Sequence, residues 1–137
     1  MQGSEVAGEL EQRFPGKDPC DVLTGLVKEA REFIENEAIE EILSRNPGIV
    51  GFSSTFQSNC CALALIKEIK KRRPEIITVI GGANCEAEMG EELIVRYPYI
   101  DYVGRGECDR TFVDLVRNLT EKIKKPRFPI YIVAGES

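Results

Sequence analysis

Two neighbouring segments of the chain decide its fold: Ile49-Val50-Gly51-Phe52-Ser53-Ser54-Thr55-Phe56-Gln57-Ser58-Asn59 and Ile76-Ile77-Thr78-Val79-Ile80-Gly81-Gly82-Ala83-Asn84. Each segment starts with a short apolar run and ends in a polar or glycine-rich turn, and a helical stretch lies between them. This pattern is typical of two buried parallel strands joined by a helix. Because ligands bind at the carboxyl ends of strands in an open parallel sheet, these turns also predict where a site lies.

The same alternation of apolar runs and helical periodicity continues toward the C-terminus. We expect strands near residues 49–53, 76–80, 100–104 and 129–133, with one helix between each strand and the next. Strands that alternate with helices through short connections predict an α/β domain. The sheet is expected to be mainly parallel and four-stranded, with helices on both faces, because its strands are apolar along their whole length.

The N-terminal part of the chain departs from this pattern. Residues 1–17 are rich in the helix breakers glycine and proline, so we expect a flexible segment there and an α/β domain over residues 18–137. Asp18 and Pro19 predict the start of a long helix, and Asn46-Pro47-Gly48 predicts its end.

The strand that normally opens a doubly wound domain is not visible in the sequence. Residues 1–17 hold no apolar run of four residues, so the expected sheet lacks its opening strand. A free strand edge invites pairing with another segment. We therefore expect the N-terminal segment to cover this edge, or the domain to self-associate through it.

Length and composition exclude several classes of function. The chain has 137 residues, the size of one domain, and no apolar run approaches the length of about 18 residues that a membrane span needs. Its net charge of −5 argues against nucleic acid as a partner, because phosphate backbones require a basic face. The N-terminus does not resemble a secretory signal, and five irregularly spaced cysteines indicate a reducing compartment. We expect a cytoplasmic protein without a membrane or nucleic-acid partner.

Histidine is absent from the chain. Its absence removes the usual general base, the commonest metal ligand and every Ser-His or Cys-His catalytic arrangement. The cysteines form no CxxC or CxxxCxxC motif, so neither a zinc ribbon nor a local iron–sulfur site is predicted. We assign no catalytic residue and no metal ligand in this chain.

Three turns are expected at the same edge of the sheet. Ser53-Ser54-Thr55 joins hydroxyls to a helix N-terminus and suits a phosphate or an amide, although Ser and Thr also cap helices at such turns. Gly81-Gly82 allows a ligand to approach the backbone, but is also a common tight turn. Gly106-Glu107 offers a carboxylate either to a ligand or to the following helix. Together these turns favour a shared ligand site.

Four of the cysteines lie near these turns. Cys60 and Cys61 start a helix, but neither a glycine-rich anion loop nor an arginine accompanies them. Buried apolar packing is therefore favoured over a reactive thiol. Cys85 and Cys108 each follow a strand at the site edge, and ligand contact by either stays open.

The sequence resembles the cobalamin-binding domain that precedes the catalytic barrel in many radical S-adenosylmethionine enzymes, most of all the type that matures ribosomally made peptides. Over about residues 33–120, three segments carry this resemblance: Val50-Gly51-Phe52-Ser53-Ser54-Thr55-Phe56, Gly81-Gly82-Ala83-Asn84-Cys85-Glu86 and Ile100-Asp101-Tyr102-Val103-Gly104-Arg105-Gly106-Glu107. Ser53 and Thr55 match the family's Ser-x-Leu motif, with Thr in place of Leu, and Gly81 and Gly82 match its Gly-Gly motif. The family's Asp-x-His-x-x-Gly motif is absent.

The resemblance implies a Rossmann-like or flavodoxin-like three-layer domain that binds cobalamin. With no histidine in the chain, it implies a base-off corrinoid without a histidine ligand to cobalt. S-adenosylmethionine, an iron–sulfur cluster and the catalytic radical barrel of the same polypeptide are expected only in the intact enzyme, which would carry out methyl transfer or a related radical modification. Because the motif for the radical iron–sulfur cluster is absent here, we expect this chain to be a domain of a longer enzyme and to have no catalytic activity by itself.

Two other classes compete with this interpretation. A cofactor-free receiver-like regulatory or interaction domain would show paired acidic residues after its first strand, where this chain has Ser53-Ser54. A nucleotide-binding enzyme domain would show GxGxxG or a P-loop, and neither occurs. The resemblance assigns cofactor binding to residues of all three turns: Ser53, Ser54, Thr55, Phe56, Gln57, Gly81, Gly82, Ala83, Asn84, Gly106 and Glu107.

Overall fold

A computed structural model of the chain describes residues 2–106, 108–122 and 130–133. The chain divides into two compact units, residues 1–40 and residues 41–137. No helix in the described part of the chain is both long enough and apolar enough to cross a bilayer.

The first unit is helical over most of its described length. Helix α1 covers Gln2–Arg13, α2 covers Pro19–Phe33, and the π-helical segment η1, Ile34–Ala38, continues into α3, Ile39–Ser44. Gly3 and Gly8, read as helix breakers in the sequence, lie inside α1 instead of ending it. Glycine lowers helix propensity but does not forbid a helix. The flexibility of this segment and a domain boundary at residue 18 stay predictions.

The long helix that the sequence predicts from Asp18 onward is confirmed at both ends. At its start, Asp18 Oδ1 accepts hydrogen bonds from the backbone N–H groups of Cys20 at 2.8 Å and Asp21 at 3.3 Å. At its end, Asn46 adopts a φ of 47° and its N–H donates to Leu43 O at 2.9 Å. These are the N-cap that satisfies free N–H groups and the left-handed residue that closes the last turn.

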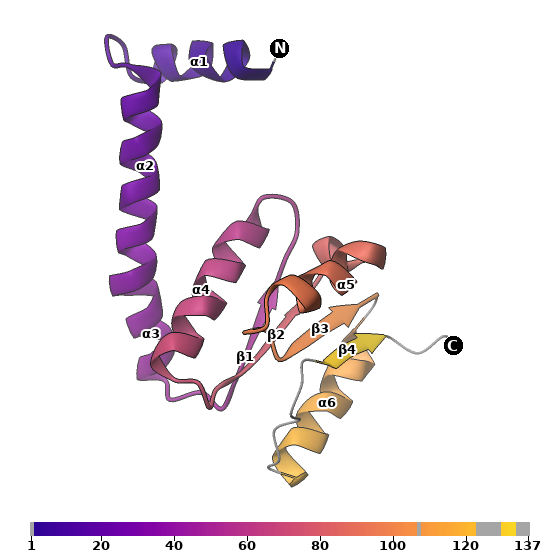
Figure 1. The fold of residues 1–137 in the computed structure, drawn as a ribbon. Helices are drawn as coiled ribbons and strands as arrows, with labels where there is room; N and C mark the ends of the chain where they lie inside the picture. The colour runs from indigo at the N-terminus through magenta and orange to yellow at the C-terminus, as the bar shows by residue number, and fades with distance from the viewer. Residues whose placement is uncertain (1, 107, 123–129, 134–137) are drawn as a thin grey trace. The chain divides into compact units, whose positions relative to one another are not determined.

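The second unit contains one parallel sheet. Its strands are β1 (Ile49–Ser53), β2 (Ile77–Gly81), β3 (Tyr102–Arg105) and β4 (Ile130–Val133), in the order β1-β2-β3-β4 (Figure 1). The connecting helices are α4 (Ser58–Arg72), α5 (Ala87–Arg96) and α6 (Asp109–Lys122). The predicted α/β class and the four parallel strands are confirmed. Among the described residues no strand precedes β1, which pairs with β2 alone.

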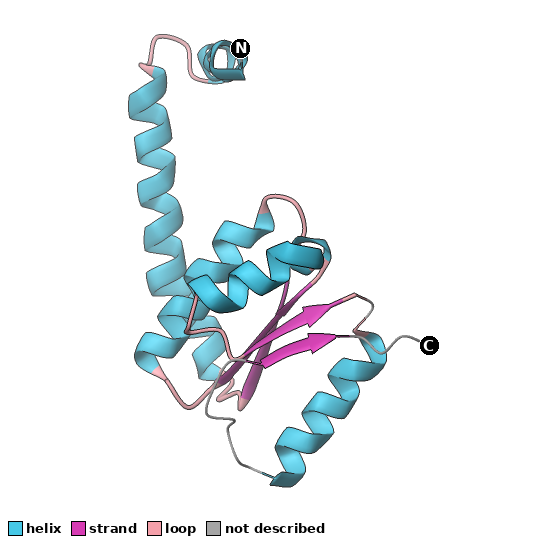
Figure 2. Cartoon of the chain, turned by 45° about the vertical axis from the view of Figure 1, so that its right-hand side comes forward, coloured by secondary structure: helices cyan, strands magenta, loops and turns pink. Residues whose placement is uncertain are grey.

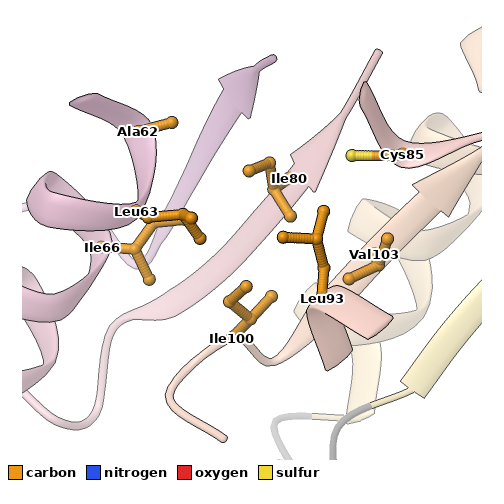
Figure 3. Close-up of a cluster of buried hydrophobic side chains, with 8 residues drawn as sticks. All are labelled: Ala62, Leu63, Ile66, Ile80, Cys85, Leu93, Ile100 and Val103. Carbon is orange, nitrogen blue, oxygen red and sulfur yellow. The ribbon is translucent and has the colours of Figure 1, made fainter. Parts of the chain in front are cut away.

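Side chains that alternate along the strands separate the two faces of the sheet. Ile80 of β2 and Val103 of β3 join a buried cluster that is drawn in Figure 3. Its other members come from α4, the 3-10 turn η2 (Ala83–Cys85), α5 and the turn before β3: Ala62, Leu63, Ile66, Cys85, Leu93 and Ile100. Gly51 of β1 pairs with Val79, the residue before Ile80, and its Cβ position therefore lies on the opposite face. A Cβ there would lie 3.8 Å from the ring of Phe112 in α6. Helices therefore cover both faces, with α4 and α5 on one and α6 on the other (Figure 2).

The third strand starts two residues later than the sequence predicts, at Tyr102 instead of Ile100. Ile100 is fully buried, and its N–H donates to Tyr97 O at 2.9 Å. Asp101 turns its carboxylate toward β2, where Oδ2 accepts the Thr78 N–H at 2.8 Å. Both residues are thus held in the turn before β3, although their apolar and β-rich sequence context resembles a strand.

A polar cluster closes the edge of the sheet at which the strands begin. Lys70 of α4 forms an ion pair with Asp101 and donates to Ile76 O at 2.7 Å. Thr78 Oγ1 lies 3.2 Å from both Asp101 Oδ2 and Tyr99 O, within hydrogen-bond distance. The ammonium and the carboxylate thus satisfy each other and the backbone around them, as groups largely removed from water require.

Candidate functional site

A cavity of about 470 Å³ opens at the other edge of the sheet, where the strands end. It lies on the face that α6 covers, because Phe112 of α6 forms one wall. Volumes of this size are common for small-molecule sites. The lining residues come from three strands and the start of α6: Gly51, Phe52, Ser53, Val79, Ile80, Gly81, Gly104, Cys108 and Phe112.

One glycine from each of three neighbouring strands forms part of this lining. A Cβ added at Gly81 would approach no protein atom closer than Gly104 O at 3.7 Å, and one at Gly51 would lie 3.8 Å from Phe112. Both are ordinary van der Waals distances, so the protein itself does not require glycine at either position. Gly104 differs, since a Cβ there would lie 2.8 Å from Cys108 Sγ. The missing side chains at Gly51 and Gly81 therefore leave space that a ligand can use.

Hydrogen bonds join the loop after β1 to the loop after β2. Asn84 Nδ2 donates to Ser54 Oγ at 3.0 Å and to Phe56 O at 2.9 Å, which uses both of its amide hydrogens. Ser54 is fully buried, and its hydroxyl donates to Asn59 Oδ1 at 2.9 Å. The predicted site residues Ser54 and Asn84 thus hold the two loops to each other.

Gly82 belongs to the same junction. Its φ is +103°, in the region that favours glycine, and a Cβ there would lie 2.7 Å from Ser54 O. The backbone of the neighbouring loop therefore requires glycine at this position. The expectation that a Cβ at Gly82 would also intrude on the slot for a nucleotide tail stays a prediction. A cofactor-binding role for Gly82 stays a prediction.

A second hydrogen bond joins the loop after β2 to the loop after β3. Glu86 Oε1 accepts the N–H of Gly106 at 2.9 Å, and Gly106 adopts a φ of +75°. The loop after β2 is therefore bonded to both of its neighbours, through Asn84 on one side and Glu86 on the other. Glu107 lies outside the described residues.

The cysteines near the site differ in exposure. Cys60 and Cys61 are both exposed, so the apolar packing expected for them is wrong: they start α4 on its solvent side. Cys85 is fully buried beneath the Gly82 turn, and burial, with smaller contributions from Cys108 and Glu86, raises the pKa of its thiol to about 11. Cys85 is therefore a neutral thiol near pH 7, and Cys108 is the thiol that lines the cavity.

The structure places the predicted site residues at one edge, in two different settings. Ser53 and Gly81 line the cavity, while Thr55, Phe56, Gln57 and Ala83 are exposed on the loops around it. Sequence reasoning missed Gly51, Gly104 and Phe112, which also line the cavity. Glycines inside apolar strands were the available signal for the first two, since glycine weakens a strand and often marks a close approach.

Comparisons with known proteins point to one family. A family model described as the B12 binding domain matches residues 22–116. This range contains β1, β2, β3 and every residue that lines the cavity. No curated protein and no solved structure gave a match.

Proposed function

The chain belongs to the B12-binding domain family, and we propose that it holds a corrinoid with the nucleotide tail in the cavity at the ends of β1, β2 and β3. The glycine lining carries this proposal: a Cβ at Gly51 or Gly81 would meet no protein atom closer than 3.7 Å. The space beside these glycines is left open at the sheet edge where ligands of parallel sheets bind.

The chemistry of the lining also supports a nucleotide tail. Val79 and the ring of Phe112 offer apolar surface to a flat base, and the exposed Ser53 offers a hydroxyl to the ribose and phosphate. The residues present therefore fit the group that the family binds. When bound, a corrinoid would supply a cobalt centre that can carry a methyl group.

We propose further that the corrinoid is bound base-off, with no histidine ligand to cobalt. The whole chain contains no histidine, so no imidazole of this chain is available as a lower ligand. In this arrangement the base of the nucleotide tail would lie in the cavity, and the residues of this chain would hold and orient the cofactor.

The parent enzyme is a proposal that depends on sequence resemblance alone. The run Gly81-Gly82-Ala83-Asn84-Cys85-Glu86 supports a radical S-adenosylmethionine enzyme of the peptide-maturation type. Methyl transfer or a related radical modification would take place in a catalytic barrel that holds S-adenosylmethionine and the iron–sulfur cluster. This domain would present the corrinoid to that barrel.

Titration of the chain with hydroxocobalamin, followed by the absorbance of the corrin, tests the central proposal. Gly81→Val places two methyl groups beside the cavity at a strand end, where valine suits the backbone. We expect this variant to keep the circular dichroism of the parent and to bind cobalamin at least about tenfold more weakly. The matched control is Gly48→Val, because a Cβ at Gly48 meets nothing within 4 Å and lies at the opposite edge.

Two outcomes would contradict the proposal. One is a parent chain that binds no cobalamin, and the other is a Gly81→Val variant that binds it as tightly as the parent. A repeat with cyanocobalamin is needed because the exposed thiols of Cys60 and Cys61 would otherwise be candidate ligands for the cobalt of hydroxocobalamin.

Separate measurements test the finer proposals. In the reduced, cobalt(II) form, electron paramagnetic resonance of a base-off corrinoid lacks the splitting from a coordinated nitrogen, and its presence would reject base-off binding. Anaerobic reconstitution with iron and sulfide should produce an iron–sulfur absorbance in the proposed longer radical enzyme. The same treatment should produce none in this chain, which has no CxxxCxxC motif.

The outer edge of β1 supports the proposed self-association. Gly48 O and Ser54 N–H bond to β2, so the backbone groups of Ile49, Gly51 and Ser53 point away from it. This edge carries no charged residue or proline, the usual protection against pairing. We propose that a second copy pairs with β1, and light scattering that finds a monomer at every concentration would reject this.

A further inference from the structure

Phe56 is exceptional among the residues at the site edge. Its side chain is 87% exposed, more than any other large apolar side chain in the described part of the chain. Its φ is +49°, a conformation that bulky L residues rarely adopt. Unfavourable exposure and unfavourable backbone thus coincide at one residue, a combination that is concentrated at functional sites.

Contacts from both sides hold Phe56 in this conformation. Asn84 Nδ2 donates to the Phe56 carbonyl at 2.9 Å, and the same amide is anchored on the buried Ser54 Oγ at 3.0 Å. On the other side, Ser58 Oγ accepts from Thr55 N at 2.8 Å and donates to Thr55 O at 2.7 Å. The ring is therefore displayed by a loop that is already ordered, which reduces the entropy that binding would otherwise cost.

The position of Phe56 indicates what the ring contacts. Phe56 follows Ser53 of the cavity lining by three residues, so their Cα atoms lie within about 11 Å of each other. A corrinoid whose tail occupies the cavity leaves its wide macrocycle outside, over the loops of the same edge. An exposed aromatic ring suits the methyl-rich face of such a macrocycle, because stacking and apolar burial act together there.

We infer that Phe56 packs on the corrin macrocycle and that Asn84 is the positioning residue that holds it there. This inference rests on the proposed function, since it assumes the nucleotide tail in the cavity. It assigns two separate parts of one ligand to two parts of the edge. Gly81 and its neighbours contact the nucleotide tail, and Phe56 contacts the corrin macrocycle.

A pair of ligands separates the two assignments. Cyanocobalamin carries the nucleotide tail, whereas cyanocobinamide has the same corrin ring and no tail. We expect Phe56→Ala to weaken both ligands by about tenfold, because the ring loses its aromatic contact in both cases. Gly81→Val should weaken cyanocobalamin and leave cyanocobinamide unchanged. Val95→Ala, at an apolar side chain of α5 that is 75% exposed, is the control and should change neither.

A double-mutant cycle tests the positioning role of Asn84. Asn84→Ala frees the Phe56 carbonyl and should weaken cyanocobinamide severalfold in the parent background. If Asn84 acts through the Phe56 side chain, Asn84→Ala should have no further effect on affinity in the Phe56→Ala background. Equal losses in both backgrounds would show a structural role only and would overturn this assignment. Circular dichroism at the titration temperature establishes that each variant is folded.

The outcomes distinguish this inference from the proposed function. A parent that binds both ligands, with Phe56→Ala binding both equally well, overturns the inference and leaves the cavity proposal standing. A Phe56→Ala variant that loses affinity for cyanocobalamin alone also overturns it, because Phe56 would then contact the tail. A parent that binds neither ligand rejects the proposed function and the inference together.

Discussion

At the edge where the strands begin, the charges of Lys70 and Asp101 are paired and mostly buried. At the edge where the strands end, polar side chains instead hold loops around an open cavity. Lys70, Asp101 and Thr78 satisfy one another at the first edge. Asn84 and Glu86 at the second edge bond to loops that lie beside a cavity of about 470 Å³. Both edges therefore use long-range polar contacts, and those of the second edge lie beside this cavity.

The difference teaches how one sheet separates stability from binding. At the closed edge, a polar side chain that is removed leaves its partners buried without a hydrogen bond, so substitutions there should act on folding. At the open edge, Gly51 and Gly81 are kept although a Cβ at either would meet only ordinary van der Waals contacts, and Phe56 is kept exposed with a positive φ. Local rules of sequence are expected to fail at functional sites, and they fail at this edge.

The largest expected effect comes from Gly82, which lies at the open edge but belongs to the structural junction. Gly82→Leu forces a side chain into the left-handed region and against Ser54 O, which a Cβ would approach to 2.7 Å. We expect it to lower the free energy of unfolding by at least about 3 kcal/mol, measured by urea denaturation. Gly48→Leu, at a glycine with open space around it, is the control. A Gly82→Leu protein with the stability of the parent and no cobalamin binding would instead support the expectation that a side chain at Gly82 blocks the slot for the nucleotide tail.

The closed edge should show the opposite separation. Asp101→Ala leaves the Lys70 ammonium and the Thr78 N–H without their carboxylate, so we expect unfolding to become easier by about 2–3 kcal/mol. Corrinoid affinity of the folded protein should not change, because Asp101 lies at the far end of the strands from the cavity. Glu41→Ala, which removes a solvent-exposed partner of Arg45, is the control and should leave the denaturation midpoint where it was. A loss of affinity in Asp101→Ala would break the comparison between the two edges.

Sequence patterns predicted the strands of this sheet better than the reasons for its glycines. β1 matches its predicted range, because a short apolar run bounded by turn residues is too short for most helices and is typical of a buried strand. The predicted start of β3 was two residues too early, because Ile100 packs in the buried core but does not pair in the sheet. Whether an apolar residue pairs or only packs depends on tertiary contacts that a local pattern does not contain.

The candidate site could be located from sequence, but its internal roles could not. The turns after three parallel strands must meet at one edge, so Ser53 and Gly81 were placed correctly near each other. The bond between Asn84 and Ser54 spans 30 positions and depends on how the two loops are oriented. Position 82 likewise could not be explained from its own segment, because glycine is required there by the backbone of Ser54 in the neighbouring loop.

A smaller effect is expected from Cys85 in alkaline solution. Burial raises the pKa of its thiol from 9.0 to about 11, so the folded state keeps a proton that the unfolded state releases. This contribution is complete below pH 9 and is lost as the pH rises through about 11, so stability should fall by about 1–2 kcal/mol across that window. In Cys85→Ala the decline between pH 9 and 11 should be shallower by that amount. Equal slopes for parent and variant, in thermal unfolding at several pH values, would contradict it.

The smallest effect changes a reaction rate and leaves stability alone, and it tests whether the cavity is the part of the open edge that a ligand covers. Cys20, Cys60 and Cys61 are exposed, so iodoacetamide should alkylate them first, while Cys85 should react last because it is buried and its raised pKa leaves little thiolate at pH 8. Cys108 lines the cavity and should be alkylated severalfold more slowly with cyanocobalamin bound. Peptide mass spectrometry reads all five thiols in one experiment, so Cys60 and Cys61 serve as internal controls. Equal protection of every cysteine would indicate a general loss of opening motions, and no protection of Cys108 would place the ligand away from the glycines of β1 and β2.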